Sequence, residues 1–382
     1  MPDTAQGHPL KVLKGPRQVG KTALLVRGGR HQPIYLDDHA TRELALRDPR
    51  FFLEQWRGPL LLDEAPLAPP LFSELKRRVD AFRRGELREP LDVWLTGSNQ
   101  TLLHRNVGES LAGRASYFDL NTLSVHELHR AGRFRLDEVM LRGGWPELYK
   151  NSALDPIRYL NDLLATFVEH DIVLAAGIER RDALAIMLRL VAARVGQLWN
   201  ASDVARNARV EVTTVQSWYR TLEENGLLRR VEPYHTNLNQ RLIKSPKIYF
   251  EDVGLAVRLQ GWTSYSPLLV SPALGCLFEN LVFSELTRWL YSRGARPDIN
   301  LVRTKDGVEV DFLVQLGSQR AVAIEVKSTF GGFTAAQHRL LDSLGLELVG
   351  RWTVVRGSVP ASSEEQPAFG IEELHERLDA LA

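Results

Sequence analysis

The chain has 382 residues, of which 44% are hydrophobic and 25% are charged, and its formal net charge is +1. These values are ordinary for a globular protein of two or three domains, and no part of the chain is basic enough to assign nucleic-acid binding by charge alone. No apolar run approaches the roughly 20 residues of a membrane-spanning helix, and no signal-peptide pattern opens the chain, so we expect a cytoplasmic protein without a membrane span.

The first predicted element is a strand at residues 10–13, which leads into the sequence Gly-Pro-Arg-Gln-Val-Gly-Lys-Thr. This spacing matches the phosphate-binding loop G-x-x-x-x-G-K-[ST] between a strand and a helix. Glycines let the backbone turn tightly, and free N–H groups at the helix start attract phosphate oxygens. We therefore predict an ATP/ADP site formed by Gly15, Pro16, Arg17, Gln18, Val19, Gly20, Lys21, Thr22 and Ala23.

Two residues of this loop have predicted chemical roles. Lys21 is expected to reach the β- and γ-phosphates, and the Thr22 hydroxyl is expected to ligate Mg²⁺. A second strand at residues 32–38 and a helix over 41–56 follow. The next strand, at residues 58–64, ends in Asp-Glu, which is the Walker B pattern. It predicts that Asp63 holds the Mg²⁺ shell and that Glu64 polarises the attacking water.

The strand at residues 91–99 ends in polar side chains. We predict that Ser98 senses the γ-phosphate or the attacking water, with Thr96 and Asn99 as further candidates; a plain exit from the strand is the alternative. Arg114, before a strand at residues 115–120, is a candidate arginine finger acting within the subunit or across an interface. A surface salt bridge is the alternative for this arginine.

Five strands with intervening helices predict an α/β fold of the P-loop NTPase kind, a parallel sheet with helices on both faces. The phosphate-binding loop, the Leu-Asp-Glu strand, Thr-Gly-Ser at 96–98, Ser-Leu-Ala-Gly-Arg at 110–114 and Leu-Arg-Gly-Gly-Trp-Pro-Glu at 141–147 resemble the prokaryotic AAA-type ATPases that carry a C-terminal domain of unknown function, DUF4143. The resemblance covers nearly the whole chain. It implies ATP hydrolysis and a homo-oligomer.

Residues 196–232 have the pattern of a helix-turn-helix followed by a wing-like strand. The first helix is expected at residues 200–208 and the second at 213–226. The side chains that would meet DNA are Thr214, Gln216, Ser217 and Arg220. Three acids oppose phosphate binding: Glu211, Glu223 and Glu224. The pattern therefore predicts either a DNA-reading module or a structural or protein-contact element.

The last region contains a second group of charged residues. Asp311 lies within a predicted strand, Glu325 and Lys327 share one face of the next strand, and Glu279 begins an apolar helix. This order resembles the PD-(D/E)xK nuclease core, in which Asp311 and Glu325 would share Mg²⁺ with an assist from Glu279, and Lys327 would position water or stabilise the transition state. The alternative is an inactive core whose acids pair with Lys327 and Arg303, and the acidic excess of this region favours it.

We therefore expect three domains: an ATPase domain at residues 1–150, a helical and winged-helix-like segment at 151–260, and a nuclease-like α/β domain at 261–382. The predicted function is Mg²⁺-dependent ATP hydrolysis whose cycle controls a C-terminal domain that binds or cuts nucleic acid. The alternative is an ATP-driven switch that acts on a protein partner through an inactive nuclease-like domain. DNA stimulation of ATP turnover separates the two.

Overall fold

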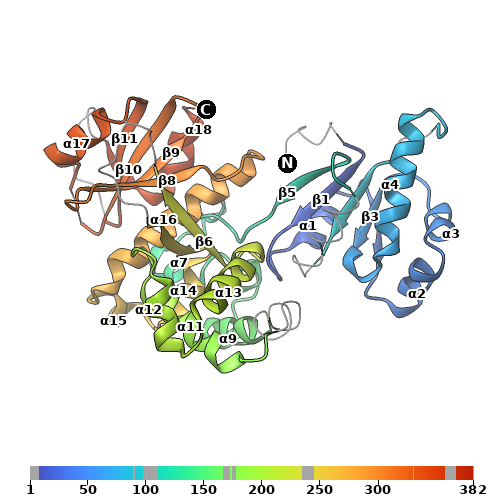
Figure 1. Ribbon diagram of the computed structural model, residues 1–382, viewed down its shortest axis with the longest axis horizontal. Helices are drawn as coiled ribbons and strands as arrows, with labels where there is room; N and C mark the ends of the chain where they lie inside the picture. The colour runs from blue at the N-terminus through green and yellow to red at the C-terminus, as the bar shows by residue number, and fades with distance from the viewer. Residues whose placement is uncertain are drawn as a thin grey trace. The chain divides into compact units, whose positions relative to one another are not determined.

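The computed structural model shows a chain folded into two compact units (Figure 1). The first is built mainly from the chain up to Asn121, and the second begins at Thr122. The structure describes residues 8–88, 91–97, 103, 111–166, 173, 178–234, 245–329, 331–357 and 367–381.

The first unit alternates strands and helices. In chain order its described elements are β1 (Leu10–Lys14), α1 (Lys21–Arg27), β2 (Gln32–Tyr35), α2 (His39–Arg47), α3 (Pro49–Glu54), β3 (Leu60–Asp63), a 3₁₀ turn (Ala65–Leu67), α4 (Pro70–Arg83), β4 (Val93–Thr96) and β5 (Ala115–Asp119). Within the described residues the five strands form one sheet in the order β2-β3-β4-β1-β5. Every neighbouring pair is parallel, which confirms the predicted fold class.

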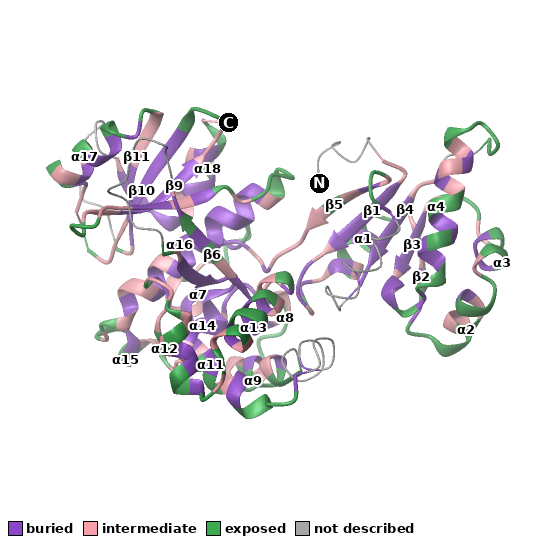
Figure 2. Ribbon diagram, viewed as in Figure 1, coloured by how far each residue is buried: buried purple, intermediate pink, exposed green. Residues whose placement is uncertain are grey.

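Helices cover both faces of this sheet because both faces are apolar. Alternate residues of the central strands point to opposite sides. One side, which includes Leu62 and Leu95, packs with Phe52 of α3 and Phe72 of α4. The other side, which includes Leu61 and Trp94, packs with Leu25 of α1. Figure 2 shows the central strands β1, β3 and β4 buried along most of their length, as expected for a sheet covered on both faces.

The helix predicted at residues 41–56 is two helices. Asp48 ends α2 and begins α3, because its carboxylate accepts the N–H of Phe51 at 2.9 Å and Pro49 stands at the first position of α3. Proline cannot donate the backbone hydrogen bond that would continue α2, and Asp is a preferred N-cap residue.

The second unit begins with short helices and ends with a mixed sheet. Its described elements are α6 (Val125–Arg130), α7 (Leu136–Arg142), α8 (Pro146–Lys150), α9 (Pro156–Thr166), α11 (Arg181–Ala193), α12 (Ala201–Ala208), α13 (Val212–Glu224), β6 (Leu228–Pro233), β7 (Lys247–Phe250), α14 (Val253–Leu259), α15 (Tyr265–Leu269), α16 (Ala273–Ser292), β8 (Ile299–Arg303), β9 (Glu309–Gln315), β10 (Arg320–Lys327), α17 (Ala335–Asp342), β11 (Glu347–Val355), β12 (Ala368–Gly370), a 3₁₀ turn (Ile371–Glu373) and α18 (Leu374–Asp379).

One sheet joins the middle of the chain to its end. In the part of the chain that the structure describes, seven strands follow the order β12-β11-β10-β9-β8-β6-β7. Strand β6 pairs with β7 antiparallel and with β8 parallel. The segment predicted at residues 151–260 and the domain predicted at 261–382 therefore form one compact unit, since their strands share backbone hydrogen bonds.

The boundary predicted at residue 150 is also wrong, because residues 122–150 belong to the second unit and form hydrogen bonds with it. Asp252, which is 2% exposed, accepts hydrogen bonds from the hydroxyl of Thr122 at 2.8 Å and the N–H of Gly144 at 2.9 Å. It also pairs with Arg288 of α16 at 3.2 Å. A Cβ built at Gly144 would lie 2.1 Å from the carbonyl oxygen of Leu123, so this close packing requires glycine and explains part of the Leu-Arg-Gly-Gly-Trp-Pro-Glu motif.

Two helices and a strand lie where the helix-turn-helix pattern predicted them. Helix α12 is capped by Asn200, whose side chain accepts the N–H of Asp203 at 3.0 Å. Arg209 then adopts φ 55°, which ends α12 in a left-handed turn before α13. Strand β6 follows α13 and pairs with β7. The interpretation of this segment as a winged helix remains a prediction.

Candidate functional site

The glycine-rich loop of unit 1 has the tight backbone that its sequence requires. Gly15 adopts φ 147°, and a Cβ built there would lie 2.0 Å from the carbonyl oxygen of Leu120. Gly20 adopts φ 90° and precedes the first residue of α1. These left-handed values favour glycine. The loop therefore leads from the carboxyl end of β1 directly into the start of α1.

Lys21 is buried within this loop. Its side chain is held by the loop backbone, since the Nζ donates to the carbonyl oxygens of Gly15 at 2.8 Å and Pro16 at 2.7 Å. The residue is only 8% exposed. A lysine ammonium needs polar partners when it is buried, and here the loop itself supplies them. The ammonium is thus positioned beside the turn that is predicted to hold the phosphates.

The carboxyl ends of β1, β3 and β4 lie at one edge of the sheet, and this edge brings three polar side chains together. Asp63 ends β3, and its Oδ1 accepts a hydrogen bond from the Thr22 hydroxyl at 2.8 Å. The Thr96 hydroxyl of β4 donates to the same oxygen. The register pairs Leu13 with Thr96 and Leu62 with Leu95. This alignment of the strand ends brings Thr22, Asp63 and Thr96 together although they lie far apart in the sequence.

The Thr22 hydroxyl and the Asp63 carboxylate suit a magnesium ion. Mg²⁺ is a hard cation that binds oxygen ligands and usually keeps several waters and substrate phosphate oxygens in its shell. The structure places one hydroxyl and one carboxylate together beside the phosphate-binding loop. The residues therefore fit the ion that the sequence predicts.

Glu64 stands directly after Asp63 in an uncommon backbone conformation. Its φ and ψ are 54° and 39°, and it begins the 3₁₀ turn that follows β3. A left-handed conformation of a non-glycine residue costs roughly 1 kcal/mol or more and tends to occur at functional sites. The conformation directs the chain sharply away from the strand, and the residue after Walker B is thereby held at the carboxyl edge of the sheet.

The other predicted residues of the loop take different positions. Val19 is buried, Gln18 is exposed with φ 61°, and Ala23 lies on the exposed face of α1. Arg17 is half-buried. Ser98 and Asn99, two candidates for the sensor, lie outside the described residues. Thr96, the third candidate, is fully buried and donates to Asp63, so its hydroxyl is the polar group of β4 that the structure brings to the site.

Arg114 does not join this site within unit 1. Its guanidinium forms two parallel hydrogen bonds with Asp80 of α4, at 2.7 and 2.9 Å. The register pairs Leu10 with Ala115, so Arg114 lies at the amino end of β5. That edge is roughly 15 Å along the strand direction from the phosphate-binding loop. The ion pair given as the alternative is present, and the position of Arg114 disfavours an arginine finger within the subunit, which stays a prediction.

A second group of charged residues lies in unit 2, and Lys247 of β7 is at its centre. Its Nζ donates to Glu279 Oε1 of α16 at 2.8 Å, pairs with Glu309 of β9, and lies 3.8 Å from Asp311 Oδ1. Lys247 is 3% exposed. The hydroxyl of Tyr249, two residues along the same strand, also donates to Glu279.

Asp311, Glu325 and Lys327 come together as their strand pattern predicted. Val326 donates its N–H to Asp311 Oδ2 at 2.8 Å, which joins β9 to β10 beside the acids. Lys327 donates to Glu325 Oε1 at 2.6 Å. The other oxygen, Glu325 Oε2, is buried without a hydrogen-bond partner.

Burial governs the ionisation of this group. Burial, together with the charges of Glu279 and Glu325, raises the pKa of Asp311 well above its ordinary value. Burial alone would lower the pKa of Lys247, but the carboxylates of Glu279, Asp311 and Glu309 raise it overall. The lysine is therefore held in its charged form.

The pairing differs from the one predicted for an inactive core. Lys327 pairs with Glu325, but Arg303 pairs with Glu309 at 2.6 Å rather than with the three predicted acids. The cation beside Glu279 and Asp311 is Lys247, which the sequence analysis missed. The available signal was the alternation of Lys247 and Tyr249 in the apolar sequence Lys-Ile-Tyr-Phe. Among the described residues, no three His, Cys, Asp or Glu side chains form a metal-binding arrangement.

Helix α13 carries the predicted DNA-facing side chains in part. Gln216, Ser217 and Arg220 are exposed, and Thr214 is half-buried. The opposite side of the helix is apolar and buried, with Trp218 and Leu222. Glu223, one of the three opposing acids, accepts hydrogen bonds from Tyr219 at 3.2 Å and from the guanidinium of Arg230 at 3.2 Å. Its charge is therefore compensated within the protein.

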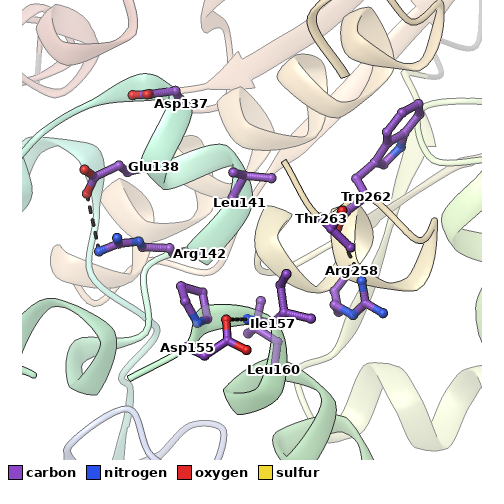
Figure 3. Close-up of a pocket in the computed structure, with 11 residues that line it drawn as sticks. Asp137, Glu138, Leu141, Arg142, Asp155, Ile157, Leu160, Arg258, Trp262 and Thr263 are labelled. Atoms are coloured by element: carbon purple, nitrogen blue, oxygen red, sulfur yellow. Dashed lines mark hydrogen bonds and ion pairs between the residues drawn. The ribbon is translucent and has the colours of Figure 1, made fainter. Parts of the chain in front are cut away.

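A cavity of about 200 Å³ in unit 2 is separate from these groups (Figure 3). Its lining residues are Asp137, Glu138, Leu141, Arg142, Asp155, Pro156, Ile157, Leu160, Arg258, Trp262 and Thr263. Its charged groups are engaged with their neighbours: Glu138 pairs with Arg142 at 3.4 Å, and Asp155 accepts the N–H of Ile157 at 3.2 Å. No predicted site residue lines this cavity, and we assign it no function.

A search of the described helices finds none with the length and hydropathy that crossing a membrane requires.

Comparison with known families agrees with the order of the two units. A family described as "AAA domain" matches residues 7–129. Two domains of unknown function follow, DUF8612 at residues 133–266 and DUF4143 at residues 274–359. The AAA match ends close to the boundary of unit 1, and both later matches lie in unit 2.

Similar proteins are found in several organisms. Uncharacterized proteins of Mycobacterium tuberculosis and Mycobacterium bovis are each 32% identical over 330 residues, which cover 84% of this chain and 70% of the relative. An uncharacterized protein of Haemophilus influenzae is 27% identical over 343 residues, covering 80% of this chain and 79% of the relative. Among solved structures, a Walker-type ATPase of Pyrococcus abyssi is 17% identical and covers 66% of this chain and 91% of its own, with a TM-score of 0.41. With an AAA-type ATPase-like domain followed by DUF4143, and with relatives that align along most of its length, this chain belongs to the family of AAA-type proteins that carry a C-terminal DUF4143 domain.

Proposed function

We propose that unit 1 binds ATP with Mg²⁺ and hydrolyses it. The observation that carries the proposal is the hydrogen bond from Thr22 to Asp63, because it joins the phosphate-binding loop to the strand predicted to hold the metal shell. In a P-loop enzyme these two residue types hold the same Mg²⁺ ion. The buried ammonium of Lys21 beside them supports the same conclusion.

Each residue has a distinct task in this reaction. The loop N–H groups and Lys21 bind the phosphates and compensate the charge that develops on the γ-phosphate. Thr22 and Asp63 hold the Mg²⁺, which neutralises phosphate charge when bound. Glu64, beyond the end of β3, orients and polarises the attacking water. Thr96 holds the Asp63 carboxylate in position by its hydrogen bond.

The Glu64→Gln variant tests this assignment. A glutamine retains the size of the side chain but removes the carboxylate that polarises water, so ATP should still bind while turnover falls about 100-fold or more. Turnover is measured by phosphate release, and binding by titration calorimetry with ATP and Mg²⁺. Glu43→Gln, an exposed glutamate on α2, is the matched control. Full turnover by Glu64→Gln would reject the role of Glu64, and absence of ATP binding by the wild type would reject the site.

We further propose that the ATP cycle controls binding of nucleic acid by unit 2 through α13. The exposed polar face of Gln216, Ser217 and Arg220 supports this, as does the compensation of Glu223 by Arg230. Polar and basic side chains on an exposed helix are suited to phosphate and base-edge contacts. Glu211 and Glu224 are exposed acids on the same segment, and they favour the alternative of an acidic contact with a protein partner.

ATP turnover with and without duplex or single-stranded DNA separates these two functions. Contact through α13 predicts stimulation that Arg220→Ala removes and that the exposed control Arg189→Ala of α11 retains. DNA that binds the wild type and Arg220→Ala equally would exclude this helix as the contact. Turnover that no DNA changes would favour the switch that acts on a protein partner.

A further inference from the structure

We propose that Lys247 takes the place of a divalent cation in the acidic group of unit 2. This group resembles a metal nuclease core in its residue types, yet its central position is held by an ammonium from within the chain. The group would then be a metal-independent joint between two parts of unit 2 rather than a cleavage site. This inference does not rest on the ATPase activity of unit 1.

The geometry around Lys247 is that of a coordinated cation. Its Nζ contacts Glu279 at 2.8 Å, also pairs with Glu309, and lies 3.8 Å from Asp311. An ammonium has three donors, and three carboxylates surround this one. The side chain is 3% exposed, so water contributes little to its solvation. The lysine is therefore stabilised by the same acids that would otherwise bind a metal.

Most of the charge of the group is already compensated from within the chain. Its four carboxylates belong to Glu279, Glu309, Asp311 and Glu325, and its cations belong to Lys247, Lys327 and Arg303. Three cations thus accompany the four carboxylates, and Lys247 lies among three of these acids. A divalent ion would add two charges beside a buried ammonium, and like charges at this distance repel strongly in a medium of low dielectric constant.

The oxygen atoms of the group are also largely used. Glu279 Oε1 accepts from both Lys247 and Tyr249, Asp311 Oδ2 accepts from Val326, and Glu325 Oε1 accepts from Lys327. Mg²⁺ requires near-octahedral oxygen coordination at about 2.0–2.1 Å. Glu325 Oε2 is the buried oxygen of the group that has no partner. The ammonium of Lys247 lies among Glu279, Glu309 and Asp311, and in the described part of the chain no three His, Cys, Asp or Glu side chains are grouped so that they could hold a metal. The residues as arranged therefore do not fit the ion.

Lys247 and the acids around it come from two different matched domains of unit 2. The lysine comes from β7, within the DUF8612 match, whereas the acids come from α16, β9 and β10, within the DUF4143 match. The ion pairs thus connect the segment that carries α13 to the C-terminal sheet. They act together with the β6–β8 pairing to make the two matched domains one body.

Binding of Mn²⁺ to the full chain tests the proposal. Electron paramagnetic resonance measures free Mn²⁺, without nucleotide, in proteins that all carry Asp63→Asn to remove the metal site of unit 1. The four samples are this parent, the parent with Asp311→Asn, the parent with Lys247→Met, and the parent with both changes. We expect equal, negligible binding to the parent and its Asp311→Asn form up to millimolar Mn²⁺. We expect Lys247→Met to gain one Mn²⁺, which the added Asp311→Asn change removes.

Two results would overturn the proposal. The first is one Mn²⁺ bound by the parent and lost with Asp311→Asn. The second is a folded Lys247→Met protein that gains no Mn²⁺, which would show that the lysine is not what excludes the ion. Circular dichroism establishes folding, and where Lys247→Met does not fold, the comparison between the parent and Asp311→Asn alone decides. Lys247→Arg, which keeps the charge, should bind no Mn²⁺.

Discussion

Asp63 of unit 1 and Asp311 of unit 2 are both aspartates in β-strands, but their surroundings differ. Asp63 ends β3, and its carboxylate accepts hydrogen bonds from the hydroxyl groups of Thr22 and Thr96. Asp311 lies within β9, is buried, and has the ammonium of Lys247 nearby. An acid that contacts hydroxyl groups next to a phosphate-binding loop can recruit a cation together with its ligand. An acid already compensated from within the chain serves the fold instead. The residue type is the same, and its neighbours determine its role.

The largest expected effect is on the stability of unit 2. Lys247→Met leaves the carboxylates around Nζ without their cation, and removal of one partner of a buried ion pair typically costs about 3–5 kcal/mol in the free energy of unfolding. Denaturant unfolding monitored by circular dichroism measures this cost. Lys247→Arg, which retains the charge, should lose less. A cost below about 1 kcal/mol for Lys247→Met would show that the ammonium does not hold the acids together.

Asp63→Asn should act on activity rather than on stability. The amide retains the shape of the side chain but lowers the negative charge that holds Mg²⁺, so ATP turnover should fall about 100- to 1,000-fold. Phosphate release measures the loss, and unfolding in denaturant should remain close to that of the wild type. If Asp63→Asn destabilised the chain as strongly as Lys247→Met, the contrast between the two acids would fail.

A smaller effect is expected from a histidine of unit 2. Burial, with the neighbouring ring of His375, lowers the pKa of His126 below its ordinary 6.5. Because the unfolded chain then takes up the proton more readily, His126 contributes stability above about pH 6.5. That contribution is lost as pH falls through the lowered pKa of the folded state.

We therefore expect the unfolding midpoint in urea to decrease between pH 7.5 and 5.5, and His126→Gln to make this decrease shallower. His129→Gln, an exposed residue of the same helix, is the control. Identical pH profiles of wild type and His126→Gln would contradict the assignment.

The smallest effect is expected for Arg114→Ala. The guanidinium pairs with Asp80 and lies at the edge of the sheet away from the phosphate-binding loop, so ATP turnover measured at low protein concentration should stay within about twofold of the wild type. Turnover that depends on protein concentration in the wild type but not in Arg114→Ala would instead indicate that this arginine acts across a subunit interface.

Much of unit 1 could be predicted because its signals are local. Short sequence patterns identify the loop at residues 15–22, the Walker B strand and the strand that ends at Thr96. Parallel strands then bring their carboxyl ends to one edge of the sheet. The break at Asp48 in the predicted helix also has a local signal, because an N-cap residue followed by proline is typical of a helix start. The expected helix over 41–56 did not take this signal into account.

Unit 2 was predicted less well because its interactions connect distant residues. Asp252 contacts a threonine 130 positions earlier in the chain, and Lys247 contacts a glutamate 32 positions later. Neither pairing has a fixed spacing, so the boundary at residue 150 and the division at residue 260 followed composition rather than contacts. The acids of the C-terminal domain were found by strand alternation, but their cation was not.

The sequence by itself determined the phosphate-binding loop, the class of the parallel sheet and the family, since these depend on backbone conformation and strand order that short motifs specify. Only the tertiary structure decided the partners of the charged side chains: Asp80 for Arg114, Lys247 for Glu279 and Asp311, and Arg288 for Asp252. The physical reason is that a buried charge needs compensation, and the group that compensates it is chosen by proximity in space, not along the chain.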